Sequence, residues 1–325
     1  MYQSKLNIKE TEKAIKIIKT IFEEKLINNL NLSRISAPMF VKEKTGINDD
    51  LNGVEKPVSF KYKDEEIQIV HSLAKWKRMA LYDYDFKLGE GIYTDMNAIR
   101  KDEELDPIHS IYVDQWDWEK IINKENRNLD YLKETVKLIY QCVKETEKEI
   151  NKIYPVLENK LPEDIFFITT DELLELYPNI SSKERENEIS RKYKAVFLIG
   201  IGDELKNNQP HDGRSPDYDD WHLNGDILLF NEALDSAFEI SSMGIRVDKE
   251  SLIHQLTKKG KLERLKFSYH QMIISETLPF TIGGGIGQSR LSMYLLEKKH
   301  IGEVQASYWP DEMIEECKKN NIILL

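Results

Sequence analysis

Residues 283–290 of this 325-residue chain read Gly-Gly-Gly-Ile-Gly-Gln-Ser-Arg, and the interpretation of the fold starts from them. Glycine has no Cβ, so such a run lets the backbone pass very close to a flat or bulky group. Apolar residues at helical spacing follow over residues 288–299, which places Arg290 in the first turn of a predicted helix. A cation at a helix start is unfavourable unless an anion meets it there. The stretch therefore predicts a strand-to-helix turn that is suited to an anion.

Two common phosphate-binding motifs do not fit this stretch. A Walker loop ends in Gly-Lys followed by Ser or Thr, whereas this one ends in Gln288, Ser289 and Arg290. The dinucleotide-binding pattern would need glycine at position 290. Taken alone, the glycines are equally compatible with a tight turn that carries a surface arginine. Other motifs in the chain are needed to distinguish this tight turn from an anion site.

Composition limits the function classes that need to be considered. With 40% hydrophobic residues and no Pro-, Gly- or Ser-rich linker, we expect one domain over residues 1–325. The net charge of -11 argues against a nucleic-acid partner. Cys142 and Cys317 are far apart, so we expect both to be reduced and buried. Without a signal peptide or a long apolar run, we expect a cytoplasmic protein that has no membrane partner, and we assign no histidine a catalytic part.

The first 41 residues contain a candidate dimer element. Apolar residues at helical spacing over residues 8–30 predict an amphipathic helix, and a β-like stretch with Pro38 follows over residues 32–41. Proline lacks the donor for a sheet ladder, so this strand should lie at an edge or across an interface. An ordinary helix that packs on its own domain explains the pattern equally well.

The next segment combines a predicted loop, a hairpin and a cationic helix. Residues 46–57 are polar and turn-rich and include Asp49, residues 58–70 alternate as a hairpin, and Ser72 is placed to cap a helix. Lys75, Lys77 and Arg78 in that helix form a cationic cluster, which is typical of an anion site.

Arg100 is followed by an acidic loop over residues 101–107 and a predicted strand over residues 108–118. In that strand the alternation places Gln115 and Asp117 on one face. Arg100 could therefore reach a ligand on the sheet, although a surface salt bridge to Asp102 or Glu103 is the simpler alternative.

Two later segments offer oxygen ligands. Residues 202–221 form a long acidic loop that includes Asp219, and loops of this length tend to be functional. Residues 237–247 predict a strand in which Glu239 and Ser241 share one face. A carboxylate next to hydroxyl groups suits magnesium, which prefers oxygen ligands. A solvent-facing strand glutamate is the alternative.

In order and content these segments resemble the three motifs of the class II aminoacyl-tRNA synthetase catalytic domain. Pro38 resembles the proline of motif one, Arg100 the arginine of motif two, and residues 283–290 motif three. The strand that carries Glu239 resembles the metal-binding strand of the aspartate and asparagine branch. The resemblance implies an α+β fold with an antiparallel β-sheet flanked by helices.

Over essentially the whole chain the sequence is still more similar to the aspartate–ammonia ligase family. The resemblance is carried by HSLAKWKR at residue 71, YVDQWDWE at 112, PDYDDW at 216, LNGDIL at 223 and TIGGGIGQSRL at 281. It implies a homodimeric enzyme that makes L-asparagine from L-aspartate, ATP and free ammonia through a β-aspartyl-adenylate, releasing AMP and pyrophosphate. A ligase that transfers the amino acid to RNA or protein, and a catalytically silent regulatory relative, are the alternatives.

The resemblance also implies roles for individual residues. The nucleotide is expected at Arg100, Ser110, Asp219, Glu239, Ser241 and Arg290, and Mg²⁺ at Glu239 with Ser241 or Ser242. Aspartate is expected at Asp49, Ser72, Lys77, Gln115 and Asp117. Arg100 and Arg290 are expected to act in catalysis, together with Asp49 or Asp219, one of which would take the proton of ammonium.

Overall fold

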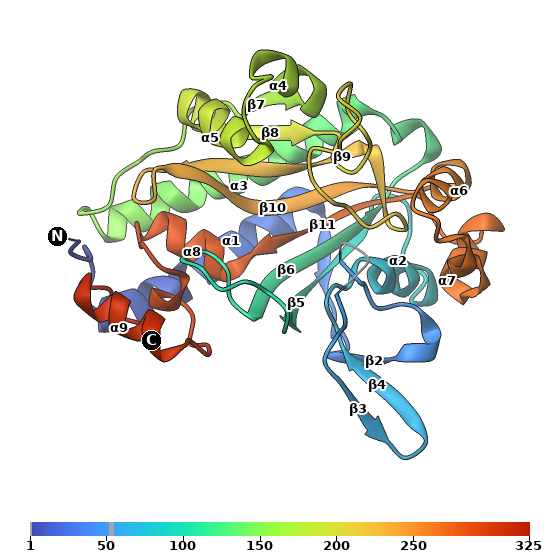
Figure 1. Cartoon of the computed structure of the whole chain (residues 1–325), viewed down its shortest axis with the longest axis horizontal. Coiled ribbons are helices and arrows are strands. Elements are labelled where there is room, and N and C mark those ends of the chain that lie inside the picture. Colours follow the sequence, from blue (N-terminus) through green and yellow to red (C-terminus); the bar gives the residue numbers. More distant parts are fainter. Residues whose placement is uncertain (1, 52–54) are drawn as a thin grey trace.

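The computed structural model describes residues 2–51 and 55–325, and within them eight strands form one large sheet. In spatial order these strands are β1 (Leu32–Arg34), β5 (Gly91–Ile99), β6 (Tyr112–Ile121), β11 (Thr281–Gly287), β10 (Ser236–Arg246), β9 (Asp219–Asn231), β8 (Ala195–Ile199) and β7 (Phe166–Thr169). A smaller sheet of β2 (Phe40–Lys42), β4 (Glu65–Ile69) and β3 (Ser59–Tyr62) projects from the body of the molecule (Figure 1).

Helices surround the large sheet (Figure 1). The α-helices of the described residues are α1 (Ile8–Leu30), α2 (Ala74–Asp83), α3 (Leu129–Ile153), α4 (Thr170–Leu176), α5 (Ser182–Tyr193), α6 (Lys249–Lys258), α7 (Ser268–Ile274), α8 (Gln288–Leu295) and α9 (Asp311–Lys319). Short 3₁₀ helices are η1 (Glu43–Thr45), η2 (Lys124–Asn126), η3 (Leu262–Lys266) and η4 (Ile301–Glu303). No helix in the described part of the chain combines the length and apolar character that crossing a bilayer requires.

The centre of the large sheet is antiparallel, from β5 through β6, β11, β10 and β9 to β8. Parallel pairs occur only at its two edges, where β1 joins β5 and β7 joins β8. The predicted fold class, an α+β fold built on an antiparallel sheet, is therefore confirmed.

One face of this sheet forms the main core with α1, α3 and α8. Trp116 and Trp118 on β6 are fully buried there, and the Trp116 ring lies 4.7 Å from that of Phe22 on α1. Successive residues of a strand point to opposite faces, so Gln115 and Asp117 point away from this core. The polar side chains of β6 therefore lie on the opposite face, part of which is covered by α2, α4 and α5.

Helix α1 has the predicted bounds because its ends are capped. Asn7 and Glu10 form a reciprocal capping box, and the helix ends where Asn31 takes a left-handed conformation. The predicted single strand over residues 32–41 is wrong, however. It is split into β1 and β2, and Pro38 lies between them, because proline cannot donate to a ladder. Strand β1 lies at an edge of the large sheet, as predicted.

Several other boundaries differ from the predictions. Helix α2 has Leu73 as its N-cap, while Ser72 Oγ accepts a hydrogen bond from the Ala74 N–H at 3.1 Å. The predicted acidic loop over residues 202–221 ends sooner, because β9 begins at Asp219 and continues past Trp221. Within the predicted loop over residues 46–57, residues 52–54 lie outside the described residues. Cys142 and Cys317 are buried and unpaired, as predicted.

Candidate active site

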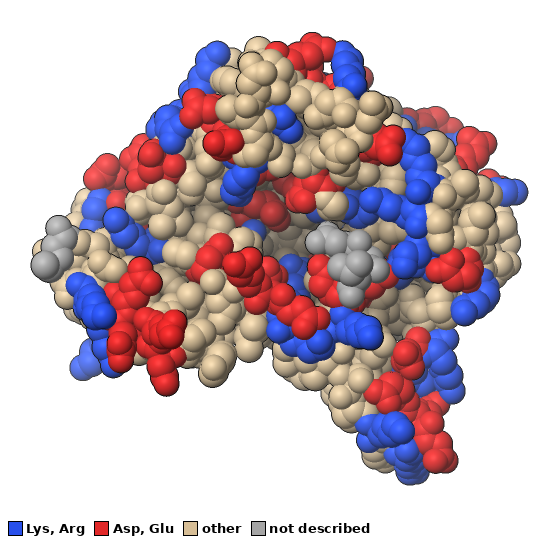
Figure 2. Space-filling view, in the orientation of Figure 1, with Lys and Arg blue, Asp and Glu red and all other residues tan. Residues whose placement is uncertain are grey.

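A polar cleft of about 320 Å³ opens on the face of the sheet opposite the main core. Its floor is made by β6, β11 and β10. Its walls are made by the start of α2, by Asp49, Leu51 and Glu55, and by residues from the segments 100–110 and 212–218. Charged side chains of both signs gather around the hollow at the centre of this view (Figure 2). Such a lining suits a charged ligand better than an apolar one.

A row of paired residues crosses the floor. Asp117 on β6 is paired with Gly285 on β11, Gly285 with Ser242 on β10, and Ser242 with Asp226 on β9. Directly paired residues share a face, so this row presents polar groups to the cleft on both sides of one glycine.

The glycines of β11 make room for neighbouring side chains. A Cβ on Gly285 would lie 2.3 Å from Gln115 Oε1 and 2.7 Å from Asp117 Oδ1. A Cβ on Gly283 would lie 2.0 Å from Glu119 Oε2. The polar residues of β6 therefore fold across β11, which requires the bare backbone there.

Lys77 enters the cleft from α2. Its Nζ lies 3.2 Å from Asp117 Oδ2 and donates to the Gly284 carbonyl at 3.0 Å. Burial lowers the pKa of Lys77, and the charge of Asp117 opposes that effect. The predicted cationic cluster is not one site, because Lys75 binds Asp217 and Arg78 donates to backbone carbonyls. Of the three cations, only Lys77 lines the cleft.

Arg246 lines the cleft and binds two carboxylates. Its guanidinium binds Glu119 through two nitrogens, at 2.7 Å from Nη2 and 3.0 Å from Nε, and it also pairs with Asp219. Burial alone would raise the pKa of Glu119, but Arg246 outweighs it and the pKa is lowered. Burial also raises the pKa of Asp219, against the opposing charges of Arg246 and Arg214.

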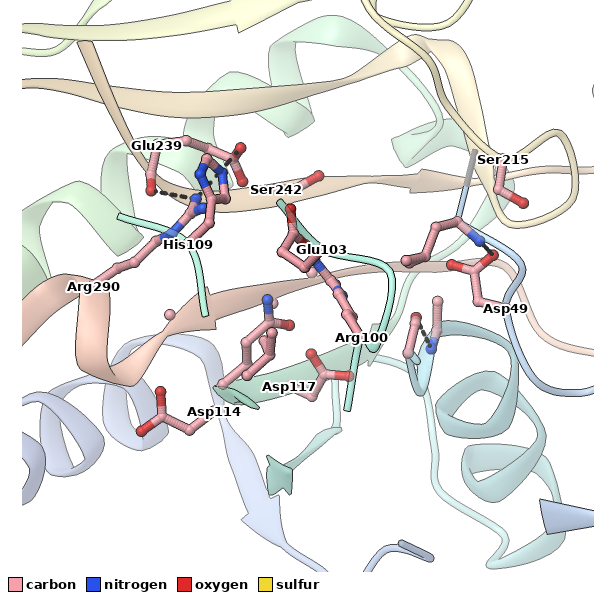
Figure 3. Close-up of a pocket in the computed structure, with 18 of the residues that line it drawn as sticks. Asp49, Arg100, Glu103, His109, Asp114, Asp117, Ser215, Glu239, Ser242 and Arg290 are labelled. Atoms are coloured by element: carbon pink, nitrogen blue, oxygen red, sulfur yellow. Dashed lines mark hydrogen bonds and ion pairs between the residues drawn. The ribbon is translucent and has the colours of Figure 1, made fainter. Parts of the chain in front are cut away.

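Arg100 lies at the rim, in the loop after β5, and it faces the cleft (Figure 3). Among the described residues no ion pair joins Arg100 to Asp102 or Glu103, and Asp102 pairs with Lys101 instead, at 2.8 Å. The Nε of Arg100 is buried without a hydrogen-bond partner among residues 2–51 and 55–325. A guanidinium with an unused donor in a polar cleft is suited to an anionic ligand.

Glu239 and Arg290 come together on the other side of the cleft (Figure 3). Arg290 Nη1 donates to the Glu239 carbonyl at 3.0 Å and lies 3.7 Å from its Oε2. Burial would raise the pKa of Glu239, but Arg290 and Arg214 outweigh it, so the pKa is lowered. Arg290 is in the first turn of α8, where the sequence placed it.

The predicted placement of Ser241 beside Glu239 is wrong. A register shift between Glu239 and Ser241 inserts one extra residue, Ile240, and this β-bulge reverses the alternation. Ser241 is paired with Ile286 and Ile227, both core residues, and it does not line the cleft. Ser242, two residues after the bulge, lines the cleft instead.

Asp49 lies on the opposite wall from Glu239 and is almost fully buried. Its Oδ1 accepts the Leu51 N–H at 3.0 Å, whereas its Oδ2 has no hydrogen-bond partner in the described chain. Burial raises the pKa of Asp49 to about 6, with Lys75 acting in the opposite direction.

With Ser241 excepted, the structure brings the predicted site residues to this one cleft. The predicted residues that line it are Asp49, Ser72, Lys77, Arg100, Ser110, Gln115, Asp117, Asp219, Glu239, Ser242 and Arg290. The sequence reasoning missed Arg214, which lines the cleft and pairs with Asp226 at 2.5 Å, and also missed Arg246. The signal for each was a lone arginine, in an acidic loop for Arg214 and in an apolar strand for Arg246.

Comparisons with known proteins agree with this geometry. A family model described as aspartate-ammonia ligase matches residues 9–321. The aspartate–ammonia ligase of Bacillus cytotoxicus is 58% identical over 326 residues, which cover 100% of both chains. The chain belongs to the aspartate–ammonia ligase family. A Clostridium perfringens ligase is 60% identical over 327 residues, covering 100% of this chain and 97% of the relative.

Solved structures that resemble this ligase include tRNA synthetases. The asparaginyl-tRNA synthetase of Pyrococcus horikoshii, complexed with asparaginyl-adenylate, matches with a TM-score of 0.68 at 16% identity, over 92% of this chain and 69% of that one. An aspartyl-tRNA synthetase of Entamoeba histolytica matches with a TM-score of 0.60 at 16% identity, over 91% of this chain and 57% of that one. At such identities the likeness shows the fold alone, which is the predicted class II synthetase fold.

Family membership establishes the reaction of this enzyme. It is a ligase that makes L-asparagine from L-aspartate and ammonia in an ATP-dependent reaction. The cleft described above is the cavity in which the predicted substrate residues meet.

Proposed function

We propose that the ligase works in two steps, forming β-aspartyl-adenylate and pyrophosphate first and then exchanging AMP for ammonia. One observation carries this proposal: Arg100, Glu239 and Arg290, from three distant segments, line a single cleft together with Lys77 and Asp117. The synthetase of the same fold in complex with an aminoacyl-adenylate supports it by analogy.

The first step joins two anions, so the cleft must supply positive charge at the reacting phosphate. Arg100, which faces the cleft from its rim (Figure 3), would bind the α-phosphate. Arg290 would meet a further phosphate or the adenine face. Its position at the start of α8 adds the positive end of the helix dipole to its own charge. Ser110 and Asp219 line the remaining surface that is available to the nucleotide.

Magnesium would bind at Glu239 and Ser242. The residues fit the ion, because Glu239 has a lowered pKa and is anionic at neutral pH, and because both residues present oxygen ligands to the cleft. In the described residues no group of three or more His, Cys, Asp or Glu forms a ready metal site. Two protein ligands leave room for phosphate oxygens and water, as is usual for magnesium with nucleotides. The ion would neutralise phosphate charge there.

Aspartate would bind on the β6 side of the cleft. Lys77 lines the cleft and is suited to a substrate carboxylate, because cationic donors bind carboxylates strongly. Gln115 and Asp117, on the same face of β6, suit the ammonium and polar groups of the amino acid. Ser72 lines the wall beside them.

The second step needs neutral ammonia, so a base must take a proton from ammonium. Asp49 and Asp219 are the two candidates. Asp219 is occupied by Arg246, whereas one oxygen of Asp49 accepts no hydrogen bond within the described chain, and burial raises the pKa of Asp49 to about 6. We therefore favour Asp49. Asp49→Asn and Asp219→Asn variants, supplied with aspartyl-adenylate, test the choice: unchanged rates in both would exclude both residues.

We further propose that the chain acts as one catalytic domain in a cytoplasmic homodimer. The main core joins residues from Leu6 to Leu324, which supports one domain. The capped helix α1 and the edge strand β1 are the elements that resemble a synthetase dimer interface. The need for ATP and the two free cysteines support the cytoplasm. Sedimentation at micromolar concentration tests the dimer.

The exchange of labelled pyrophosphate into ATP tests the adenylate directly. Exchange that requires aspartate and magnesium but no ammonia would support the proposal, and asparagine formation without any exchange would refute it. Adding tRNA distinguishes the alternative ligase, because aminoacylated tRNA would then appear.

A further inference from the structure

A buried carboxylate beside the cleft has no role in the steps above. The side chain of Asp217 is fully buried, just before β9. It accepts from three other segments: from Lys75 Nζ on α2 at 3.1 Å, from Arg264 Nη1 on η3 at 2.9 Å and from His270 Nε2 on α7 at 3.0 Å. Ser215 Oγ, which lines the cleft, donates to it at 3.0 Å. One carboxylate thus joins four parts of the chain.

Two of these donors also hold the loop that carries Asp49. Arg264 Nη2 pairs with the carboxylate of Asp50, and Lys75 Nζ donates to the Gly46 carbonyl at 3.2 Å. Both bonds are made by groups that bind Asp217 at the same time. The loop over residues 46–50 is therefore attached to the segment before β9 through two cations and one shared anion. Figure 3 shows Asp49 and Ser215 on the same side of the cleft.

We infer that Asp217 is a positioning residue for the ammonia step, which fixes the Asp49 carboxylate at the cleft through Arg264 and Lys75. The inference rests on the proposed function, in which Asp49 takes the proton of ammonium. Proton transfer requires the base within hydrogen-bond reach, and a displacement of about 1 Å costs a reaction about 100-fold. A buried, fully paired carboxylate is a rigid anchor for such a base because each of its donors is itself held by packing.

The same groups also set the charge around Asp49. The charged or titratable groups that face it are Lys75 on α2, Asp50 in its own loop, His71 at its carbonyl, Asp217 and Tyr218 before β9, and Arg264 on η3. After burial, which is the main cause of its raised pKa, Lys75 lowers the pKa of Asp49 and Asp217 raises it. Lys75 and Asp217 bind each other but shift the pKa of Asp49 in opposite directions.

Two variants of similar size, Asp217→Asn and Lys75→Gln, test these opposite effects on the pKa of Asp49. Asparagine formation at limiting ammonium is measured between about pH 5 and pH 9, where the acid limb reports the base. Asp217→Asn removes an anion, so the acid limb should move to lower pH, and kcat/KM for ammonium should fall at least about tenfold. Lys75→Gln removes a cation, so the limb should move to higher pH. We expect each shift to be on the order of half a pH unit or more.

Asp220→Asn is the matched control. Asp220 is also buried at the start of β9 and pairs with Arg127 at 3.0 Å, but it does not line the cleft or bind the loop over residues 46–50. This variant should lose a buried ion pair and keep the wild-type acid limb. A general loss of stability would affect it as much as Asp217→Asn.

Pyrophosphate exchange tests the proposed function separately from the positioning role of Asp217. Absent exchange in the wild type would refute the proposed function itself. Exchange within about threefold of the wild type in Asp217→Asn, together with opposite shifts of the acid limb in the two variants, would support the positioning role. Acid limbs that stay in place in the two variants, or that move in the same direction, would overturn the positioning role. If Asp217→Asn does not fold, the upward shift in Lys75→Gln decides alone.

Discussion

Gly285→Ala tests whether the glycine stretch makes room for the side chains of β6. The new Cβ would lie 2.3 Å from Gln115 Oε1 and 2.7 Å from Asp117 Oδ1, whereas ordinary contact begins at 3.4 Å. The two oxygens must therefore retreat by roughly 1.1 and 0.7 Å, the differences between those distances. Asp117 cannot retreat without disturbing its ion pair with Lys77. Overpacking of this kind costs about 1–3 kcal/mol, and a displacement of about 1 Å in a binding group costs about 100-fold in rate.

Aspartate-dependent pyrophosphate exchange measures the functional part of this cost, and urea unfolding measures the stability. We expect kcat/KM for aspartate to fall about 100-fold, with a much smaller change in KM for ATP. Gly225→Ala is the control, because its Cβ would meet the Leu198 carbonyl and the Phe197 ring, outside the cleft. It should lose stability without a selective loss of aspartate use. Wild-type kcat/KM for aspartate in Gly285→Ala would refute the reasoning.

Three further outcomes follow from the buried groups. Lys77→Met leaves Asp117 buried without its partner, so the free energy of unfolding should fall by about 3–5 kcal/mol and KM for aspartate should rise, as urea unfolding and exchange kinetics would show. For Asp49, the pKa in the native state is raised from 3.8 to about 6, so the native state loses stability as pH rises through that window. Asp49→Asn should therefore be more stable than the wild type at pH 7, by up to about 3 kcal/mol at about 1.4 kcal/mol per unit, and should lose this advantage below pH 4, while asparagine formation falls. Ser242→Ala should raise the magnesium concentration needed for half-maximal exchange, whereas Ser241→Ala should not, and should be neutral or slightly stabilising because its hydroxyl is buried without a partner in the described chain.

Much of the fold was predictable because its signals are local. Apolar residues at helical spacing predicted α1 over the same residues that the structure shows, and the alternation over residues 58–70 predicted the hairpin of β3 and β4. The boundaries that failed depend on pairing partners far away in the chain. Strand β9 begins at Asp219, within a sequence that reads as an acidic loop, because Asp219 pairs with Arg246 on β10.

The candidate site was predictable where a residue type is unusual for its position. Arg290 after a glycine run and Arg100 before an acidic loop are such cases, and both line the cleft. Buried ion pairs leave a weaker signal, since no local pattern connects Arg264 with Asp217 or Arg246 with Glu119 across more than 40 residues of sequence. These pairs exist only because the sheet and helices bring distant segments together.

Because β10 is bulged, the alternation of a regular strand could not predict which of its two serines faces the cleft. A regular strand places residues 239 and 241 on one face, and one inserted residue is enough to move the second of them into the core. No feature of the sequence Glu-Ile-Ser-Ser distinguishes the two registers, because either serine offers the same hydroxyl. The neighbours decide: Ser241 is flanked by Ile286 and Ile227, whereas Ser242 is flanked by Gly285 and Asp226. Since the flanking strands fix the register, the difference between the two alanine variants reports the strand pairing directly. The reverse outcome, in which Ser241→Ala and not Ser242→Ala raises the magnesium requirement, would mean that β10 is not bulged in solution.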